Sequence, residues 1–228
     1  MDQSPLARLA PKLRKRIYKL VQEHEAPIMV SDPHRNSSGE NLSRHHYLAL
    51  MRTCRKVRAE SLQLFYTTNT FAFEPGIWQY QNVEERSMVA FDSFRRAISG
   101  KSAAALRTVV IGVLPPHLVF NTDRMQVQFR ETVEQLYERA QQGDGCTYKL
   151  SMRVCWCIKG SHSYNDEYKS DAMTMVIEMD DFEKSCLAAE KRLSKLAGRV
   201  KNATGKRELS SVIDELQYCR AIVDRGGS

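Results

Sequence analysis

The sequence LALMRTCRKVRAESLQLFYTTNTFAF, residues 48–73, joins a long helical pattern to a short alternating one. Apolar side chains recur every three or four positions, which predicts one buried face of a helix; they are Tyr47, Leu50, Met51, Cys54, Val57, Leu64 and Phe65. Thr67, Thr68 and Asn69 end this pattern, because β-branched residues are poor helix formers and asparagine tolerates a left-handed cap. Phe71 and Phe73 then alternate with smaller residues, so we expect a half-buried strand directly after the helix.

Two shorter helical segments precede this stretch. Ser4-Pro5 is typical of a helix start, and Pro11 interrupts the pattern because proline inside a helix removes a hydrogen bond and clashes with the preceding turn. We therefore expect a short turn over residues 5–9 and a helix from Pro11 to about Glu23. The apolar residues of the turn and the helix together recur every three or four positions, and they are Leu6, Leu9, Leu13, Ile17, Leu20 and Val21. Like charges crowd the other side, so burial of the leucine face is expected to hold this helix in place.

The rest of the chain alternates strand and helix patterns. Short strands are predicted near residues 26–30, 70–74, 106–114, 148–158 and 172–179, and the third of these, LRTVVIGVL, has the near-continuous apolar content of a strand buried on both faces. Helices are predicted near residues 82–99, with Gly100 as the stop, and 123–142. Two more, starting at Asp180-Asp181 and Glu208, form an antiparallel pair. Residues 31–43 are rich in Pro, Gly, Ser and Asn and predict a loop.

Together these segments predict an α+β or α/β fold. We expect a small mixed β-sheet covered by helices and closed by a C-terminal antiparallel helical hairpin. The 228 residues are expected to form a single domain. Within it we distinguish an N-terminal helical segment over residues 4–24, the loop over 31–43, an α/β core over 44–179 and the hairpin over 180–225.

The composition indicates an intracellular protein. The hydrophobic fraction of 42% and the charged fraction of 27% are ordinary for a globular chain. No apolar run approaches the roughly 18 residues that could span a bilayer, and residues 1–16 lack the apolar core of a secretory signal. Six cysteines at irregular positions are typical of reduced thiols. We therefore expect a location in the cytoplasm or nucleus and no membrane partner.

The net charge of +7 is concentrated near the N-terminus. Twelve lysines and arginines against six acidic residues leave a charge of +6 on residues 1–60. Such a basic end can attract nucleic acid, anionic lipid or an acidic protein, and it can equally be the solvated side of two amphipathic helices. The nucleic-acid alternative would use Arg14, Lys15, Arg16, Lys19, Arg52, Arg55 and Lys56. Aromatic residues are not interleaved with these charges, which disfavours single-strand binding by base stacking.

No catalytic motif is evident. The chain lacks a glycine-rich nucleotide loop, a nucleophile elbow and an HExxH metal motif. His45-His46 and Cys54 do not have the spacing of a zinc site, and Cys155 and Cys157 are interpreted as small buried apolar side chains. We therefore expect a protein that is not an enzyme and that has no cofactor and no metal.

Two stretches resemble a known family. Residues 4–18, SPLARLAPKLRKRIY, resemble the opening of filamentous-fungal F-box-like proteins, which have a leucine pair, Pro-x-Leu-Arg and then Ile-Tyr; Lys12 stands where glutamate is usual. Residues 50–71, from Leu50-Met-Arg-Thr-Cys54 to Phe65-Tyr-Thr-Thr-Asn69-Thr-Phe71, resemble the second and more specific signature of that group. The likeness covers about residues 4–73.

The resemblance implies a docking function. An F-box is a small helical module that binds the Skp adaptor of a cullin-RING ubiquitin ligase, while the rest of the protein presents a substrate protein. The carried-over docking face would consist of Leu6, Leu9, Pro11, Leu13 and Ile17. We therefore expect a protein-interaction module that serves as a ubiquitin ligase adaptor. The alternatives are a basic nucleic-acid-associated protein and an interaction domain without adaptor docking, in which these leucines pack against the central helix.

Overall fold

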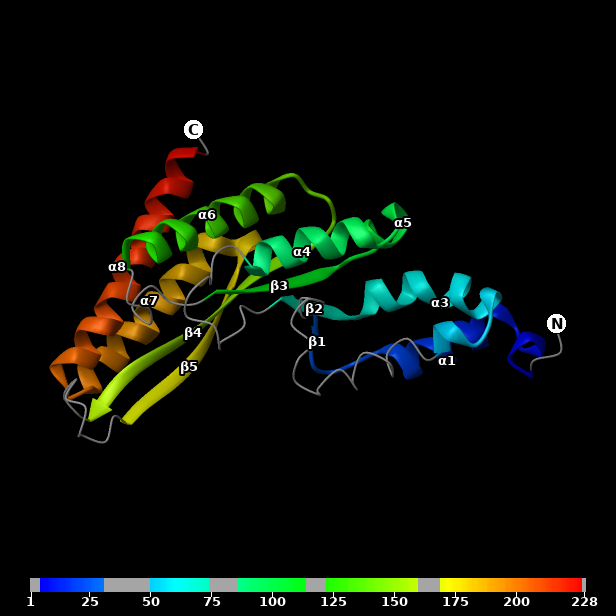
Figure 1. The fold of residues 1–228 in the computed structure, drawn as a ribbon, viewed down its shortest axis with the longest axis horizontal. Coiled ribbons are helices and arrows are strands. Elements are labelled where there is room, and N and C mark those ends of the chain that lie inside the picture. Colours follow the sequence, from blue (N-terminus) through cyan, green and yellow to red (C-terminus); the bar gives the residue numbers. More distant parts are fainter. Residues whose placement is uncertain (1–4, 31–49, 74–85, 114–121, 160–168, 227–228) are drawn as a thin grey trace.

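A five-stranded mixed sheet organises the chain. The computed structural model describes residues 5–30, 50–73, 86–113, 122–159 and 169–226 (Figure 1). The strands are β1 (Ile28–Met29), β2 (Thr70–Phe73), β3 (Thr108–Val113), β4 (Thr147–Lys159) and β5 (Lys169–Glu178). They lie in chain order, with β1 to β4 parallel and β5 antiparallel to β4. The predicted mixed sheet is therefore confirmed.

Strand register gives the sheet one apolar face. Phe71 lies beside Val109, which lies beside Tyr148 on the next strand. Because side chains alternate along a strand, every second residue points to this face, and Ile111, Leu150, Met152 and Ile177 have no exposed surface. The intervening positions on β5, such as Thr174 and Val176, are exposed on the opposite face.

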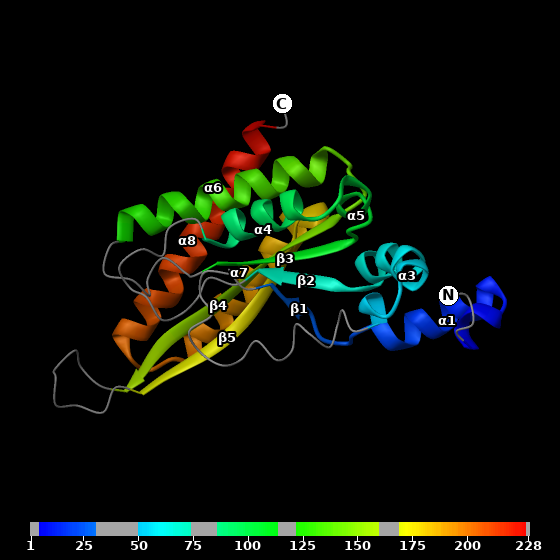
Figure 2. The same cartoon turned by 45° about the vertical axis from the view of Figure 1, so that its right-hand side comes forward.

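Helices cover the apolar face. The helices of the N-terminal half, not all of which lie on the sheet, are η1 (Pro5–Arg8), α1 (Pro11–Gln22), η3 (Leu50–Arg52), α3 (Arg55–Thr68), α4 (Arg86–Ala97) and α5 (Gly100–Ala103). Those of the C-terminal half are α6 (Thr122–Gln141), η5 (Met179–Asp181), α7 (Phe182–Arg199) and α8 (Ala203–Gly226). Helix α4 packs on β2 and β3, α6 and α8 pack on β4, and α7 packs on β5 (Figure 2). The α7–α8 pair is the predicted C-terminal hairpin, and the α+β class is confirmed.

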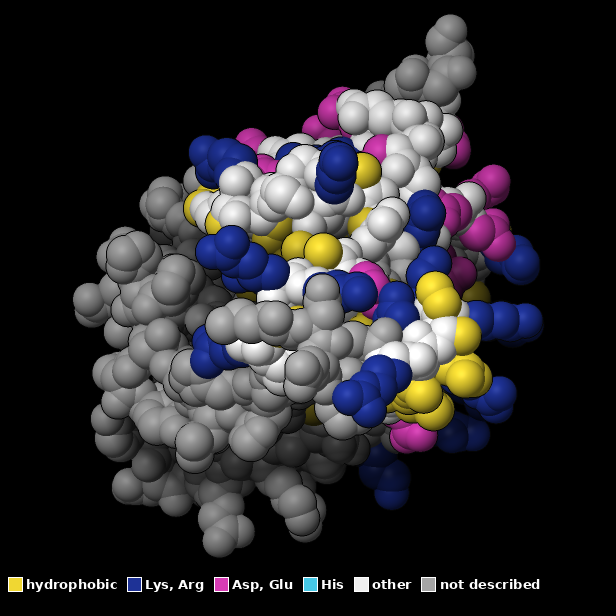
Figure 3. All heavy atoms as spheres, turned by 90° about the vertical axis from the view of Figure 1, so that its right-hand side faces the viewer, with side chains coloured by type: hydrophobic (Ala, Val, Ile, Leu, Met, Phe, Trp, Pro, Cys, Tyr) yellow, Lys and Arg dark blue, Asp and Glu magenta, His cyan; other side chains and the backbone are white. Residues whose placement is uncertain are grey.

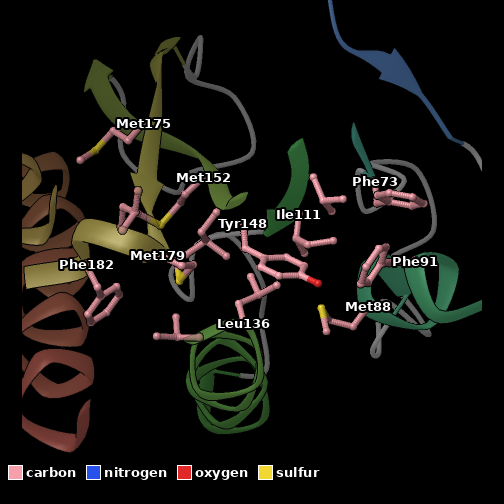
Figure 4. Packing of buried hydrophobic residues seen from close by; sticks show 14 of the residues in the cluster. Phe73, Met88, Phe91, Ile111, Leu136, Tyr148, Met152, Met175, Met179 and Phe182 are labelled. Carbon is pink, nitrogen blue, oxygen red and sulfur yellow. The ribbon is translucent and has the colours of Figure 1, made fainter. Parts of the chain in front are cut away.

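A contiguous apolar cluster of the described residues fills the space between helices and sheet. Tyr148 lies between Ile111 of the sheet and Leu136 of α6, and Phe73 faces Phe91 of α4 with ring centroids 5.3 Å apart (Figure 4). The cluster runs from Ile28 on β1 to Cys219 on α8.

Several local expectations from the sequence are corrected. The central helical pattern is two helices rather than one, because η3 ends at Arg52 and α3 begins after its N-cap, Cys54. The Cys54 Sγ atom accepts a hydrogen bond from the Val57 amide at 3.5 Å. Cys54 is therefore exposed at the start of the helix, and not in the core as predicted. Asn69 has an extended backbone (φ −104°) instead of the left-handed cap. Gly100 begins α5 rather than only ending α4, and α8 begins at Ala203, five residues before the predicted start.

Strand β3 is buried less evenly than predicted. Val109 and Ile111 are fully buried under the helices, whereas Thr108 and Val110 on the opposite face are half-buried. The predicted loop over 31–43 and the side chains of Cys155 and Cys157 lie outside the described residues. None of the described helices is long and apolar enough to cross a membrane.

Candidate partner-binding surface

Helix α1 packs against the central helix through a polar stripe. Arg14, Tyr18 and Gln22 follow one another at four-residue intervals, so they share one side of the helix. All three are buried, with Tyr18 only 1% exposed, and α1 packs on α3. The expectation that the leucine face would be the buried one is therefore wrong.

A carboxylate on α3 is the centre of this contact. The Arg14 Nε and Nη2 atoms donate to the two Glu60 carboxylate oxygens at 2.9 and 2.8 Å. The Tyr18 hydroxyl donates to the same carboxylate at 3.1 Å, and the Arg14 Nη1 atom donates to the Leu9 carbonyl oxygen at 2.6 Å. A bidentate arginine–carboxylate pair fixes both distance and orientation, so this cluster determines which side of α1 faces α3.

These contacts change the acidity of the groups involved. The hydrogen bonds from Arg14 are the main cause that lowers the pKa of Glu60, with a smaller contribution from Tyr18. Burial is the main cause that raises the pKa of the Tyr18 hydroxyl. At neutral pH, Glu60 is therefore ionised and acts as an acceptor, and Tyr18 is protonated and acts as a donor.

Asn69 joins the far ends of the same two helices. Its Nδ2 atom donates to the carbonyl oxygens of Gln22 and Phe65 at 2.8 and 2.9 Å, and its Oδ1 atom accepts from the His24 amide at 2.9 Å. Asn69 is 2% exposed. The end of α1 is therefore fixed to the junction between α3 and β2.

The packing leaves much of the apolar side of α1 exposed. Leu13 is 52% exposed, Leu20 is 74% exposed and Val21 is 56% exposed. An ideal helix of 3.6 residues per turn places Leu13 and Leu20 nearly in line. Figure 3 looks at the end of the molecule where η1 and α1 lie, and it shows hydrophobic side chains gathered there with lysine and arginine side chains around them. We call Leu13, Ile17, Leu20 and Val21 the α1 apolar face.

The predicted docking residues lie on or beside this face to different degrees. Pro11 and Leu13 are exposed, whereas Leu6, Leu9 and Ile17 are half-buried. Leu20 and Val21 are more exposed than most of the predicted set. They belong to the same apolar repeat in the sequence, which could have identified them, but they follow residues 4–18, the first of the two stretches that carry the family resemblance.

The seven basic residues predicted for nucleic-acid binding do not all lie on an exposed surface. Arg14 is buried and paired with Glu60, so it is not part of an exposed basic surface. The others are exposed: Lys15, Arg16 and Lys19 on α1, and Arg52, Arg55 and Lys56 on η3 and α3. The Lys19 Nζ atom lies 3.7 Å from the Glu23 Oε1 atom.

Within the described ranges, no group of three His, Cys, Asp or Glu side chains is arranged to hold a metal ion. Comparison with known proteins finds no matching family model, and no curated protein or solved structure is significantly similar to the chain.

Proposed function

We propose that this chain is a non-enzymatic, F-box-like protein-interaction module that binds a Skp-type adaptor of a cullin-RING ubiquitin ligase through the α1 apolar face. The α/β remainder would hold a substrate protein. The observation that carries the proposal is the exposure of Leu13, Leu20 and Val21 on a helix at one end of the molecule (Figure 1).

The contact between α1 and α3 supports this proposal. The two stretches that resemble fungal F-box-like proteins contribute opposite sides of one cluster, since Arg14 and Tyr18 belong to the first and Glu60 belongs to the second. The two stretches that carry the resemblance therefore pack together in one structural unit.

The energetics of an apolar face also favour a partner. Burying one leucine side chain is worth about 1.5–3 kcal/mol, and a few such anchors usually supply most of the affinity of an interface. Leu20, which is 74% exposed, contributes little of this energy to the fold, and Leu13, which is 52% exposed, contributes only part of it. A complementary apolar groove on a partner would recover it.

The test is a pulldown of the full chain by a purified fungal Skp-type adaptor. We expect the wild type to bind and Leu20→Asp to lose binding at least tenfold, because a carboxylate cannot enter an apolar groove without a large desolvation cost. Leu187→Asp is the matched control, since Leu187 is a leucine 46% exposed on α7. Failure of the folded wild type to bind, or equal binding by both variants, would refute adaptor docking.

Nucleic-acid binding is the second candidate, supported by the exposed Lys15, Arg16 and Lys19 on α1 and by Arg55 and Lys56 on α3. Affinity for duplex DNA should then fall steeply with salt, as bound counterions are released. A Lys15→Gln/Arg16→Gln variant should bind more weakly and with a shallower salt dependence. Absence of binding to duplex or single-stranded probes at low salt removes this candidate.

A further inference from the structure

An open cavity of about 780 Å³ lies between α4 and α6. The described residues that line it are all polar or charged: Asp92, Arg95, Arg96, Gln135, Glu138, Arg139 and Gln142. Four of these seven residues are exposed and the other three are half-buried, so the cavity is a groove rather than an enclosed pocket. Three arginines and two carboxylates give it a net positive charge.

One arginine forms a fixed wall of this groove. The Arg139 Nη1 atom lies 2.9 Å from Asp92 Oδ1, and its Nη2 atom donates to Asp92 Oδ2 at 3.2 Å. The same guanidinium lies over the Phe91 ring, 5.3 Å from its centroid. Arg139 therefore neutralises Asp92, and its position is set by two independent contacts.

The other two arginines use only some of their donors in contacts with the part of the chain that the structure describes. Arg95 makes one long contact, 3.4 Å from its Nη2 atom to Asp144 Oδ2, an oxygen that also accepts the Tyr148 hydroxyl at 2.7 Å. Within the described ranges, the Arg96 Nε atom donates only to a carbonyl of its own helix, that of Asp92 at 3.2 Å. Among the described residues, no carboxylate pairs with Arg96. Two guanidinium groups thus have donors available to a ligand in one groove.

Helix ends explain part of this arrangement but not all of it. Arg95 and Arg96 lie in the last turn of α4, and Arg139 lies in the last turn of α6. Cations at these positions stabilise the helix dipole. Stabilising the helix dipoles does not require the three side chains to point toward the same place. Here, however, all three line the same groove.

We propose that the groove between α4 and α6 binds the acidic side chains of an extended peptide segment from a partner protein. The planar, forked guanidinium matches the two oxygens of a carboxylate or the oxygens of a phosphate, and the amides of Gln135 and Gln142 add further donors. Pockets for small molecules are mostly apolar and bury most of the ligand. An open groove lined by polar and charged residues instead suits a peptide that lies across the surface.

The test is fluorescence anisotropy of labelled peptides with the full chain at low salt. The probes are a Gly-Ser peptide with three consecutive glutamates, the same peptide with glutamines, and a version with one phosphoserine. We expect an acidic probe to bind at least tenfold more tightly than the glutamine probe. If only the phosphoserine probe binds, the group that the arginines recognise is a phosphate. If the glutamate probe binds, that group is a carboxylate.

Variants separate this groove from general attraction to a basic protein. Arg95→Gln/Arg96→Gln should weaken acidic-peptide binding at least tenfold, whereas Arg199→Gln, which removes an exposed arginine from the last turn of α7, should not. Glu138→Gln should strengthen binding two- to threefold, because Glu138 is an exposed carboxylate on the groove that repels an anionic ligand. Equal binding by the glutamate, glutamine and phosphoserine probes, or an equal effect of Arg199→Gln, would overturn the proposal. Competition by free inorganic phosphate at the same affinity as the peptide would overturn the peptide assignment.

This inference does not depend on adaptor docking. The groove and the α1 apolar face consist of different residues on different helices, and no adaptor is present in the peptide experiment. A chain that binds acidic peptide but no adaptor would retain the groove and lose only the proposed function.

Discussion

Glu60 is the residue on which the position of α1 depends. Its carboxylate accepts hydrogen bonds from the Arg14 guanidinium and the Tyr18 hydroxyl, and these bonds lower its pKa in the folded state. A carboxylate with a lowered folded-state pKa stabilises the fold above its unfolded pKa. That contribution is lost as the pH falls through the folded-state pKa.

The Glu60→Gln variant tests this linkage. The difference in unfolding free energy between wild type and variant should be largest at neutral pH. It should shrink as the pH falls below the ordinary glutamate pKa of roughly 4.3, because the wild type then loses its ionised acceptor and the variant has none to lose. Urea denaturation of both proteins, followed by circular dichroism at successive pH values, measures this difference in unfolding free energy. Glu131→Gln, on an exposed site of α6, is the control, and a pH-independent difference for Glu60→Gln would contradict the assignment.

At the scale of the element, α1 is an amphipathic helix whose polar stripe faces inward. Tyr18 is 1% exposed and Leu20, two residues later, is 74% exposed. The sequence pattern correctly predicted where the helix begins and about where it ends. It predicted the wrong inward face, because the apolar repeat was the only signal available from α1 itself. The partner of Arg14 is 46 residues away, and nothing in the local sequence pairs Arg14 with Glu60.

Two alanine substitutions measure this orientation. Tyr18→Ala should lower the unfolding free energy by about 3–5 kcal/mol, as expected for truncation of a large buried aromatic side chain. Leu20→Ala should change it by no more than about 0.5 kcal/mol, since exposed side chains contribute little. Chemical denaturation of both variants gives the comparison. The opposite order of effects would mean that the leucine face is the one in the core.

At the scale of the whole molecule, the sheet has one face under helices and an opposite face with exposed positions. The sequence predicted the strands to within a few residues, since their apolar runs are local. Sheet order and direction depend on pairing between segments far apart in the chain, such as Val109 with Tyr148, and no local pattern encodes that. The candidate surface was predicted in part: Leu13 and Pro11 are exposed, whereas the exposure of Leu20 depends on packing between α1 and α3.

Adjacent residues of β5 test which face is covered. Ile177 is fully buried and Val176 is 52% exposed. Ile177→Ala should destabilise the fold by about 2–5 kcal/mol, and Val176→Ala by about 0.5 kcal/mol or less. Thermal or urea unfolding distinguishes the two, and similar losses for both variants would indicate that the β5 face carrying Val176 is also covered.

Site-directed photo-crosslinking tests the central claim, that the α1 apolar face is a docking surface, most directly. A photoreactive amino acid is placed at position 20 in one sample and at position 187 in another, and each is irradiated with the purified Skp-type adaptor. We predict an adaptor crosslink from position 20 and none from position 187, because only Leu20 belongs to the α1 apolar face. A crosslink from position 187 alone, equal crosslinks from both positions, or no crosslink from position 20 would contradict the claim.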